Sequence, residues 1–193
     1  MRCIRQPTSP GAFRHESDSS QVVRPSRSPG KRRAKARGAR VIGVARERPA
    51  EGSPAAQLMD EFVLLDDSAV ERVQALTGGG ADVVFDAVGG VMFETALKLA
   101  KRRGRVVEIS ATGKRRVEFD LIDFYHNETQ LFGADSAKLG VAESARLMTA
   151  LADGFDSGKL TAPVIAQRFP LVAAREAYEA VAAGTAGRVV INM

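Results

Sequence analysis

The pattern of hydrophobic and polar positions divides the chain into two parts that meet near residue 34. Before that point no apolar repeat of helix or strand period emerges, and proline, serine and arginine dominate. From Ala34 onward, short apolar runs alternate with segments of helical spacing. Such alternation indicates a parallel sheet with helices on both faces. We therefore predict an α/β protein, an incomplete Rossmann-type doubly wound parallel sheet that follows a disordered N-terminus.

The apolar runs and the residues that end them predict the individual elements. Strands are expected at 41–46, 61–67, 81–86, 104–110 and 130–134, and helices at 54–60, 69–76, 91–101 and 141–153. Ser68 is expected to cap the helix that follows it, with Glu71 at the third helical position as in a capping box. The glycines at 78–80 are expected to end that helix.

The C-terminal tail has a different order of predicted elements. The runs "TAPVIAQRFPL" and "GRVVINM" have the pattern of strands, and they flank an alanine-rich helix at residues 172–183. The regular alternation of strands and crossover helices seen in the preceding part does not continue here. We therefore expect the two tail strands to belong to another sheet.

Charge is spread unevenly along the chain. The formal net charge is +5, but residues 1–40 hold nine Arg and two Lys against Glu16 and Asp18, a net +9, which leaves −4 for residues 41–193. The globular part is thus mildly acidic. A polyanionic partner would have to bind the N-terminal segment, so nucleic acid is an unlikely partner for the folded part.

The residue inventory excludes two classes of protein. Cys3 is the only cysteine, and His15 and His126 are the only histidines, so neither an internal disulfide nor a tetrahedral Cys/His zinc site is possible. No apolar run approaches the roughly 20 residues that span a bilayer, and no signal-peptide core follows the N-terminus. We expect no metal site, no membrane partner and a cytoplasmic location.

Three explanations compete for the basic segment at residues 1–33. It could be a transit-peptide-like leader, a nucleic-acid-binding arm, or a stretch that never evolved with the domain, such as a wrong start site or a frameshifted gene start. The third is favoured, because the domain pattern begins abruptly in the middle of a helix, where neither a leader nor an arm would place the junction.

The start of the domain pattern raises a specific question about phosphate binding. Residues 35–37 have the pattern of a last helical turn, Gly38 that of a helix stop, and the apolar run at 41–45 that of a buried second strand. A dinucleotide-binding unit needs a first strand and a glycine-rich loop before that helix. The upstream glycines, Gly11 and Gly30, do not follow a strand pattern. The upstream segment is therefore expected to be unable to cradle a pyrophosphate.

Six motifs in order resemble a known family. They are "GADVVFDAVGG", "GRVVEIS", "SGKL" with "PVI", "FPL", "EAYEAV" and "AGRVVI". Together they resemble the medium-chain dehydrogenase/reductase superfamily, in particular its zinc-free quinone oxidoreductase branch, the zeta-crystallin-like enzymes. The resemblance runs over residues 34–193. It implies a truncated dinucleotide-binding domain at 34–160 and tail strands and a helix of a catalytic domain at 161–193, after the basic segment at 1–33 that composition predicts to be disordered.

The expected site lies at the carboxyl ends of the strands, where open parallel sheets bind ligands. Gly89 and Gly90 would let the chain pass close to a cofactor, although a plain glycine turn explains them equally well. The resemblance places a second loop beside the nicotinamide carboxamide. This loop consists of Ser110, Ala111, Thr112 and Gly113. No catalytic side chain is assigned, because the nicotinamide does the chemistry and the protein orients it.

The residue after the second strand bears on the choice of cofactor. An acid there would bind the ribose hydroxyls of NAD, but the sequence has Arg46, with Arg48 close behind. Either guanidinium could pair with a 2′-phosphate, so NADP(H) is the expected cofactor, unless Arg46 is only a solvated charge. Asp86 is interpreted as structural, held by a partner or a loop amide. His126 is interpreted as a surface or edge residue.

The resulting hypothesis is an NADPH-dependent quinone or enal reductase-like oxidoreductase in a truncated, weakly active or inactive chain. Its expected partners are a small quinone or enal and a second copy of the chain, since the strand at 130–134 should be a sheet edge and the family pairs such edges. Two alternatives remain: a non-catalytic dimerising scaffold, and a nucleic-acid-binding protein with a basic arm.

Overall fold

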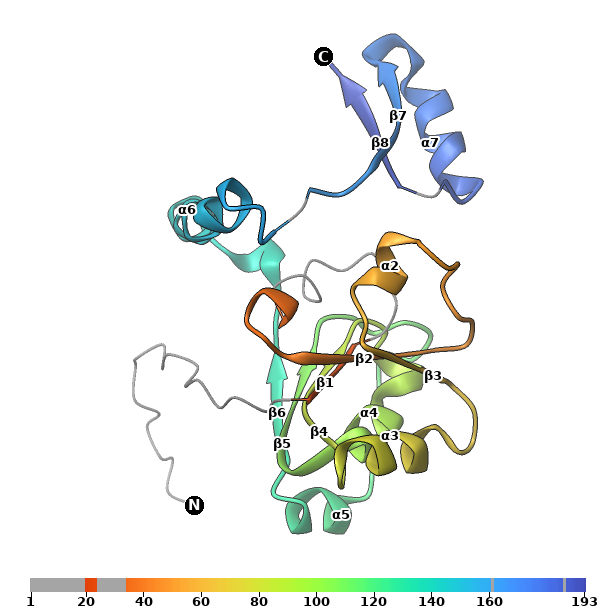
Figure 1. Ribbon diagram of the computed structural model, residues 1–193, viewed down its shortest axis with the longest axis vertical. Coiled ribbons are helices and arrows are strands. Elements are labelled where there is room, and N and C mark those ends of the chain that lie inside the picture. Colours follow the sequence, from red (N-terminus) through yellow and green to blue (C-terminus); the bar gives the residue numbers. More distant parts are fainter. Residues whose placement is uncertain (1–19, 24–33, 161, 186) are drawn as a thin grey trace. The chain divides into compact units, whose positions relative to one another are not determined.

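The structure is a computed structural model, and it describes residues 20–23, 34–160, 162–185 and 187–193. The chain forms two compact units that divide between Lys138 and Leu139 (Figure 1). In the described ranges, no helix is long and apolar enough to cross a membrane.

The first unit is built on one six-stranded sheet in which every neighbouring pair of strands is parallel. The order across the sheet is β3-β2-β1-β4-β5-β6, the order of a Rossmann sheet (Figure 1). The strands are β1 (Ser20–Val23), β2 (Arg40–Ala45), β3 (Glu61–Leu64), β4 (Ala81–Asp86), β5 (Ala100–Glu108) and β6 (Gln130–Gly133). The predicted doubly wound parallel α/β fold is confirmed.

Residues 20–23 belong to the segment that was predicted to be disordered, but they form strand β1. Strand β1 lies in the middle of the sheet, where Val22 pairs with Ile42 of β2 on one side and with Val84 of β4 on the other. The sequence "SQVV" is too short to show a period, and arginine and proline follow it. Hydrogen bonding to β2 on one side and β4 on the other stabilises β1, although its sequence shows no strand pattern. The rest of the segment predicted to be disordered, 1–19 and 24–33, lies outside the described residues.

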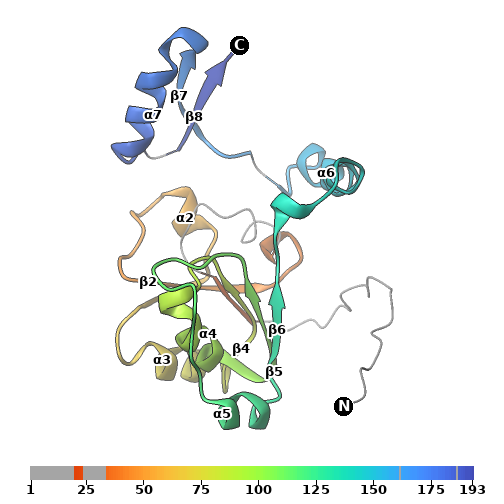
Figure 2. The same ribbon diagram turned by 180° about the vertical axis from the view of Figure 1, so that it is seen from behind.

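Two helices cover one face of this sheet and form the larger core. Helices α3 (Ala69–Thr77) and α4 (Phe93–Leu99) lie side by side on it in both views (Figures 1 and 2). The core residues beneath and within them include Ile42, Val44, Val63, Val73, Val84, Ala96, Leu99 and Val106. The opposite face has its own smaller cluster, Ala34, Ala39 and Val41, against which Met59 and Phe85 pack. Apolar residues thus alternate between two covered faces, as doubly winding requires.

Of the two predicted ends of helix α3, the C-terminal end is as predicted and the N-terminal end is not. The predicted glycine stop is confirmed, because helix α3 ends at Thr77 and its C-cap Gly78 adopts the left-handed conformation. Its predicted capping box is absent, because Ser68 makes no side-chain cap. The Ser68 hydroxyl instead donates to Asp66 Oδ1, 2.9 Å away, which also accepts the Ser68 amide. The Ser68 side chain thus hydrogen-bonds to an upstream carboxylate and not to the amides of the first helical turn.

The shorter elements complete the first unit. Strand β5 begins at Ala100 rather than at Gly104, and its pairing with β4 is irregular near Ala81. The remaining elements are α2 (Pro54–Gln57), η1 (Gly90–Met92), α5 (Leu121–His126) and η2 (Ser136–Lys138). Helix α5 is capped by Asp120, whose Oδ1 accepts the amides of residues 122 and 123.

The second unit contains the predicted tail strands. They are β7 (Ile165–Pro170) and β8 (Arg188–Asn192), which pair with each other in a separate two-stranded parallel sheet. Helix α7 (Ala174–Ala182), preceded by η3 (Leu171–Ala173), contacts both strands. The unit also contains α6 (Val141–Asp156). The exposed apolar side chains of this unit include Val164, Ile165 and Tyr178.

Candidate functional site

The loops at the carboxyl ends of β2, β4 and β5 form one edge of the sheet. This follows from the parallel pairing, because every strand in the sheet points the same way. The predicted site residues all follow one of these three strands. The fold therefore brings Gly89, Gly90 and the loop 110–113 to the edge where open α/β sheets bind ligands.

The loops after β4 and β5 are joined by backbone hydrogen bonds. The amide of Ile109 donates to the Asp86 carbonyl at 3.3 Å, and the amide of Thr112 donates to the Val88 carbonyl at 2.7 Å. The amide of Val91 donates back to Thr112 at 3.4 Å. The sequence predicted both loops, and the structure joins them into one surface.

The two glycines of the first loop are required by this junction. Gly89 has φ 57° and ψ −156°, a conformation essentially reserved for glycine. A Cβ on Gly89 would lie 1.8 Å from the carbonyl oxygen of Ser110, and a Cβ on Gly90 would lie 2.2 Å from that of Thr112. The loop-to-loop contact explains both glycines without a ligand, so their part in cofactor binding stays a prediction.

The second loop presents polar groups to solvent. Ser110, Ala111, Thr112 and Gly113 are all exposed, and the hydroxyls of Ser110 and Thr112 lie 3.4 Å apart. Gly113 has φ 76° and packs near Val91. Hydroxyls and backbone groups of this kind can bind an amide such as a carboxamide through hydrogen bonds.

Two acidic side chains lie where the loops leave the sheet. Asp86 is 5% exposed, and its Oδ1 accepts the amides of Val88 at 2.8 Å and Gly89 at 2.9 Å. The prediction that a loop amide holds Asp86 is confirmed. Glu108, at the end of β5, had no predicted role. Burial, and then the charge of Asp86, raise the pKa of Glu108 to about 7.

The two arginines after β2 have different environments. The guanidinium of Arg48 lies over the ring of Phe62, 4.8 Å from its centroid, beside the edge strand β3. Arg46 is exposed, and its side chain makes no hydrogen bond or ion pair with the described part of the chain. Of the two, Arg46 is therefore the one available to an anionic ligand.

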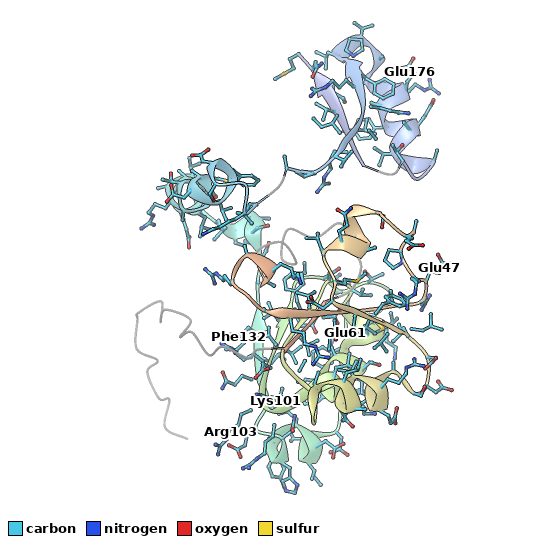
Figure 3. The ribbon with its side chains drawn as sticks, in the orientation of Figure 1. Glu47, Glu61, Lys101, Arg103, Phe132 and Glu176 are labelled. Atoms are coloured by element: carbon cyan, nitrogen blue, oxygen red, sulfur yellow. The ribbon has the colours of Figure 1, made fainter. Side chains whose placement is uncertain are left out.

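The basic residues of the opposite edge are engaged with acids. Lys101 forms an ion pair with Asp82, and Arg102 and Arg103 both pair with Glu128; Lys101 and Arg103 are labelled in Figure 3. These pairs lie at the amino end of β5 and just before β6. Two acids thus offset two of the three positive charges, which weakens the attraction of this edge for a polyanion.

The cluster around His126 belongs to that opposite edge as well. The side-chain amide of Asn127 donates to the carbonyls of Ala100 and Lys101 and to the hydroxyl of Thr129. The His126 ring lies edge-on to Tyr125, with centroids 4.5 Å apart. Asn127 thus ties α5 to the start of β5, and His126 lies away from the predicted site.

The strand order, the buried clusters on both faces and the loop surface at the carboxyl edge together define a dinucleotide-binding domain of Rossmann type. Comparison with known proteins identifies the family. The family model "Zinc-binding dehydrogenase" matches residues 32–153, and the chain belongs to this family, within the medium-chain dehydrogenase/reductase superfamily. The predicted superfamily is confirmed.

Individual relatives include both alcohol dehydrogenases and quinone oxidoreductases. The uncharacterized zinc-type alcohol dehydrogenase-like protein YphC of Escherichia coli (strain K12) is 34% identical over 165 residues, which are 82% of this chain and 44% of YphC. A solved NAD-dependent alcohol dehydrogenase is 28% identical, with a TM-score of 0.72, over 93% of this chain and 52% of that one. The quinone oxidoreductase of Thermus thermophilus, solved also with NADPH, is 25% identical, with a TM-score of 0.69, over 91% and 58%.

The chain belongs to the family but matches only part of each relative. The chain spans between 44% and 58% of the length of these three relatives. The zinc-free quinone oxidoreductase branch stays a prediction, because the relatives include both kinds of enzyme. The described residues contain no group of three or more His, Cys, Asp or Glu side chains that could hold a metal ion.

Proposed function

We propose that this chain is the cofactor-binding part of an NADP(H)-dependent oxidoreductase of the quinone or enal reductase type. The observation that carries the proposal is the joined loop surface at the carboxyl edge of a Rossmann sheet, with Arg46 exposed on the same edge. Family membership and a neighbour solved with NADPH support it. The expected acceptor is a small quinone or enal.

In this proposal the chain binds and orients the cofactor. When bound, NADPH would supply a hydride from its nicotinamide. The loop 110–113 would hold the carboxamide through backbone groups and hydroxyls, and Arg46 would pair with the 2′-phosphate. Positioning of this kind is the contribution a protein makes when the cofactor carries the chemistry, so no side chain of the chain is assigned a catalytic role.

The described residues fit NADP(H) at two places, beside its 2′-phosphate and beside its nicotinamide carboxamide. Strand β2 ends in Ala45, followed by Arg46, without the acid that would repel a 2′-phosphate at the strand end. The loop after β5 leaves its polar groups exposed. Residues 24–33, between β1 and the next helical turn, lie outside the described residues.

Replacing Arg46 by aspartate should reverse or abolish a preference for NADPH. The wild-type chain is expected to bind NADPH more tightly than NADH by about 1 to 3 kcal/mol, because a hydrogen-bonded guanidinium–phosphate pair contributes about that much. Titration calorimetry with both cofactors measures the difference directly. Arg48→Asp is the matched control, since Arg48 already lies over Phe62, and it should change the preference little. Equal affinities that the Arg46 substitution leaves unchanged would contradict the cofactor assignment.

The 193-residue chain by itself is expected to reduce acceptors slowly or not at all. Its match covers 44% of YphC, and the remaining part of such a relative would supply the other wall of the cleft. Positioning of bound reactants supplies roughly 7 to 11 kcal/mol of barrier reduction, so half a cleft should retain little of it. The measurement is the loss of NADPH absorbance with a quinone or an enal. Turnover at ordinary enzyme rates would contradict the expectation.

Two alternative functions make different predictions. A dimerising scaffold would form a stable dimer without nucleotide affinity. A nucleic-acid-binding protein would bind with an affinity that falls steeply with salt and depends on residues 1–40. The ion pairs of Lys101, Arg102 and Arg103 weigh against a nucleic-acid surface on the folded part. A filter-binding assay over a salt series separates this alternative from the proposal.

A further inference from the structure

Two carboxyl groups meet at the ends of β4 and β5, and the proposed function uses neither of them. Asp86 and Glu108 are register partners in the parallel pair of strands. Val84 and Val106, two residues earlier on each strand, are both buried in the larger core. Side chains two residues apart on a strand share a face, so the two acids lie on the same face of the sheet.

Each acid has one buried oxygen without a hydrogen-bond partner among the described residues. The Oδ1 atom of Asp86 accepts two loop amides, but Oδ2 is buried and accepts no hydrogen bond from the described residues. The Oε1 atom of Glu108 is likewise buried and has no such partner in the described part of the chain. Buried polar atoms are nearly always hydrogen-bonded. Because Asp86 and Glu108 are paired on adjacent strands, we look for one hydrogen bond that would satisfy both oxygens.

A single proton between the acids satisfies both oxygens. Two ionised carboxylates are acceptors only, and at contact they repel each other. A carboxylic acid has one O–H, which it can donate to a neighbouring carboxylate in a strong charge-assisted hydrogen bond. Two amide N–H groups already point at Oδ1 of Asp86, so this carboxyl group is engaged as an acceptor. Glu108 is therefore the member that holds the proton.

We propose that Glu108 retains a proton under conditions that ionise ordinary glutamates and donates it in a hydrogen bond to Oδ2 of Asp86. The resulting acid–carboxylate pair holds the turn at Gly89 from two sides. Asp86 binds the Gly89 amide, and Glu108 Oε2 lies 3.1 Å from the position of a Cβ on that glycine. Glu108 is thus a positioning residue for the loop surface, acting through Asp86. The proposal concerns the ligand-free chain and does not depend on NADP(H).

The electrostatics of the pair give its pH dependence. Burial, then the charge of Asp86 and a hydrogen bond with it, raise the pKa of Glu108 from 4.5 to about 7. On the other side of Glu108, β6 places Gly133, which has no side chain, so Asp86 is the charge that acts on it. Because the folded-state pKa is raised, the stabilisation is complete below about pH 4.5 and is lost as the pH rises through about 7.

The test is a carbon-13 NMR titration of the side-chain carboxyl groups in the ligand-free 193-residue chain. One glutamate carboxyl should titrate near pH 7, and its signal should be absent from Glu108→Gln, an isosteric variant whose amide still donates to Asp86. In Asp86→Asn the same signal should move back toward the ordinary glutamate range, since the repelling charge is gone. Glu94→Gln is the matched control at an exposed carboxylate paired with Lys98, and it should leave the signal in place.

The melting temperature provides a second readout that does not require assignment. The wild-type chain should lose stability relative to Glu108→Gln as the pH is raised from about 4.5 through about 7. Two results would overturn the proposal: all glutamate carboxyls of the wild-type chain titrating in the ordinary range, or a signal near pH 7 that persists in Glu108→Gln. Neither outcome bears on whether NADPH binds, so this proposal and the proposed function fail separately.

Discussion

Replacing Gly89 by alanine is expected to lower the free energy of unfolding by more than about 4 kcal/mol, a loss in the exceptional range for one substitution. Two effects add at this position. The backbone has φ 57° and ψ −156°, which a residue with a Cβ hardly ever adopts. The new Cβ would lie 1.8 Å from the carbonyl oxygen of Ser110, a backbone atom that cannot rotate away. This collision could be relieved only if the two loops moved apart.

The chain offers a matched control that isolates the collision. Gly78 also has a positive φ, 72°, but nothing lies within 4 Å of a Cβ built there. Gly78→Ala should therefore incur only the left-handed backbone penalty, about 1 to 2 kcal/mol. Urea denaturation of both variants gives the comparison. Similar losses for the two would contradict the close contact between the loops.

The chain is expected to dimerise through strand β6, and replacing Leu131 by proline should then give monomers or aggregates. Strand β6 is the last strand of the sheet, and all four of its residues are exposed; Phe132 is labelled on it in Figure 3. The Ala134 amide donates to Glu108 on β5, and inward-facing amides alternate along a strand. The Leu131 amide therefore faces outward, where it is available to a second copy of the chain. Proline removes that donor.

The neighbouring residue provides the control for this experiment. By the same alternation, the Phe132 amide faces β5, so Phe132→Pro should break the β5–β6 ladder and destabilise the first unit. Light scattering gives the molar mass of each variant, and circular dichroism reports its folding. A wild-type monomer, or an unchanged dimer in Leu131→Pro, would exclude this edge as the interface.

The sequence predicted most of the fold because its elements carry strong local signals. The buried strands β2 and β4 are apolar runs, α3 stops at the glycine that was expected to end it, and the loops after β4 and β5 follow their strands as predicted. Parallel strands bring their carboxyl ends to one edge, so the position of the candidate site followed from topology alone. The six motifs then identified the superfamily.

The errors of prediction have physical causes in tertiary contacts. Strand β1 has four residues and is stabilised by neighbours on both sides, which no local pattern reveals. Ser68 does not cap the helix, and its hydroxyl instead donates to Asp66, a side-chain contact that the capping pattern does not reveal. Glu108 was missed because a single acid at a strand end has no signal of its own. Its significance comes from Asp86 on the adjacent strand, whose pairing with β5 only the register reveals.

The most direct test of the central claim is an amide NMR titration of the 193-residue chain with NADPH. The claim is that the carboxyl edge of the sheet is the cofactor site. The account predicts concentration-dependent shifts for Arg46, for Gly89 and Gly90, and for the loop 110–113, with the opposite edge around Gly79 and Asn127 unchanged. Shifts centred on that opposite edge, or no shifts at any NADPH concentration, would contradict the account.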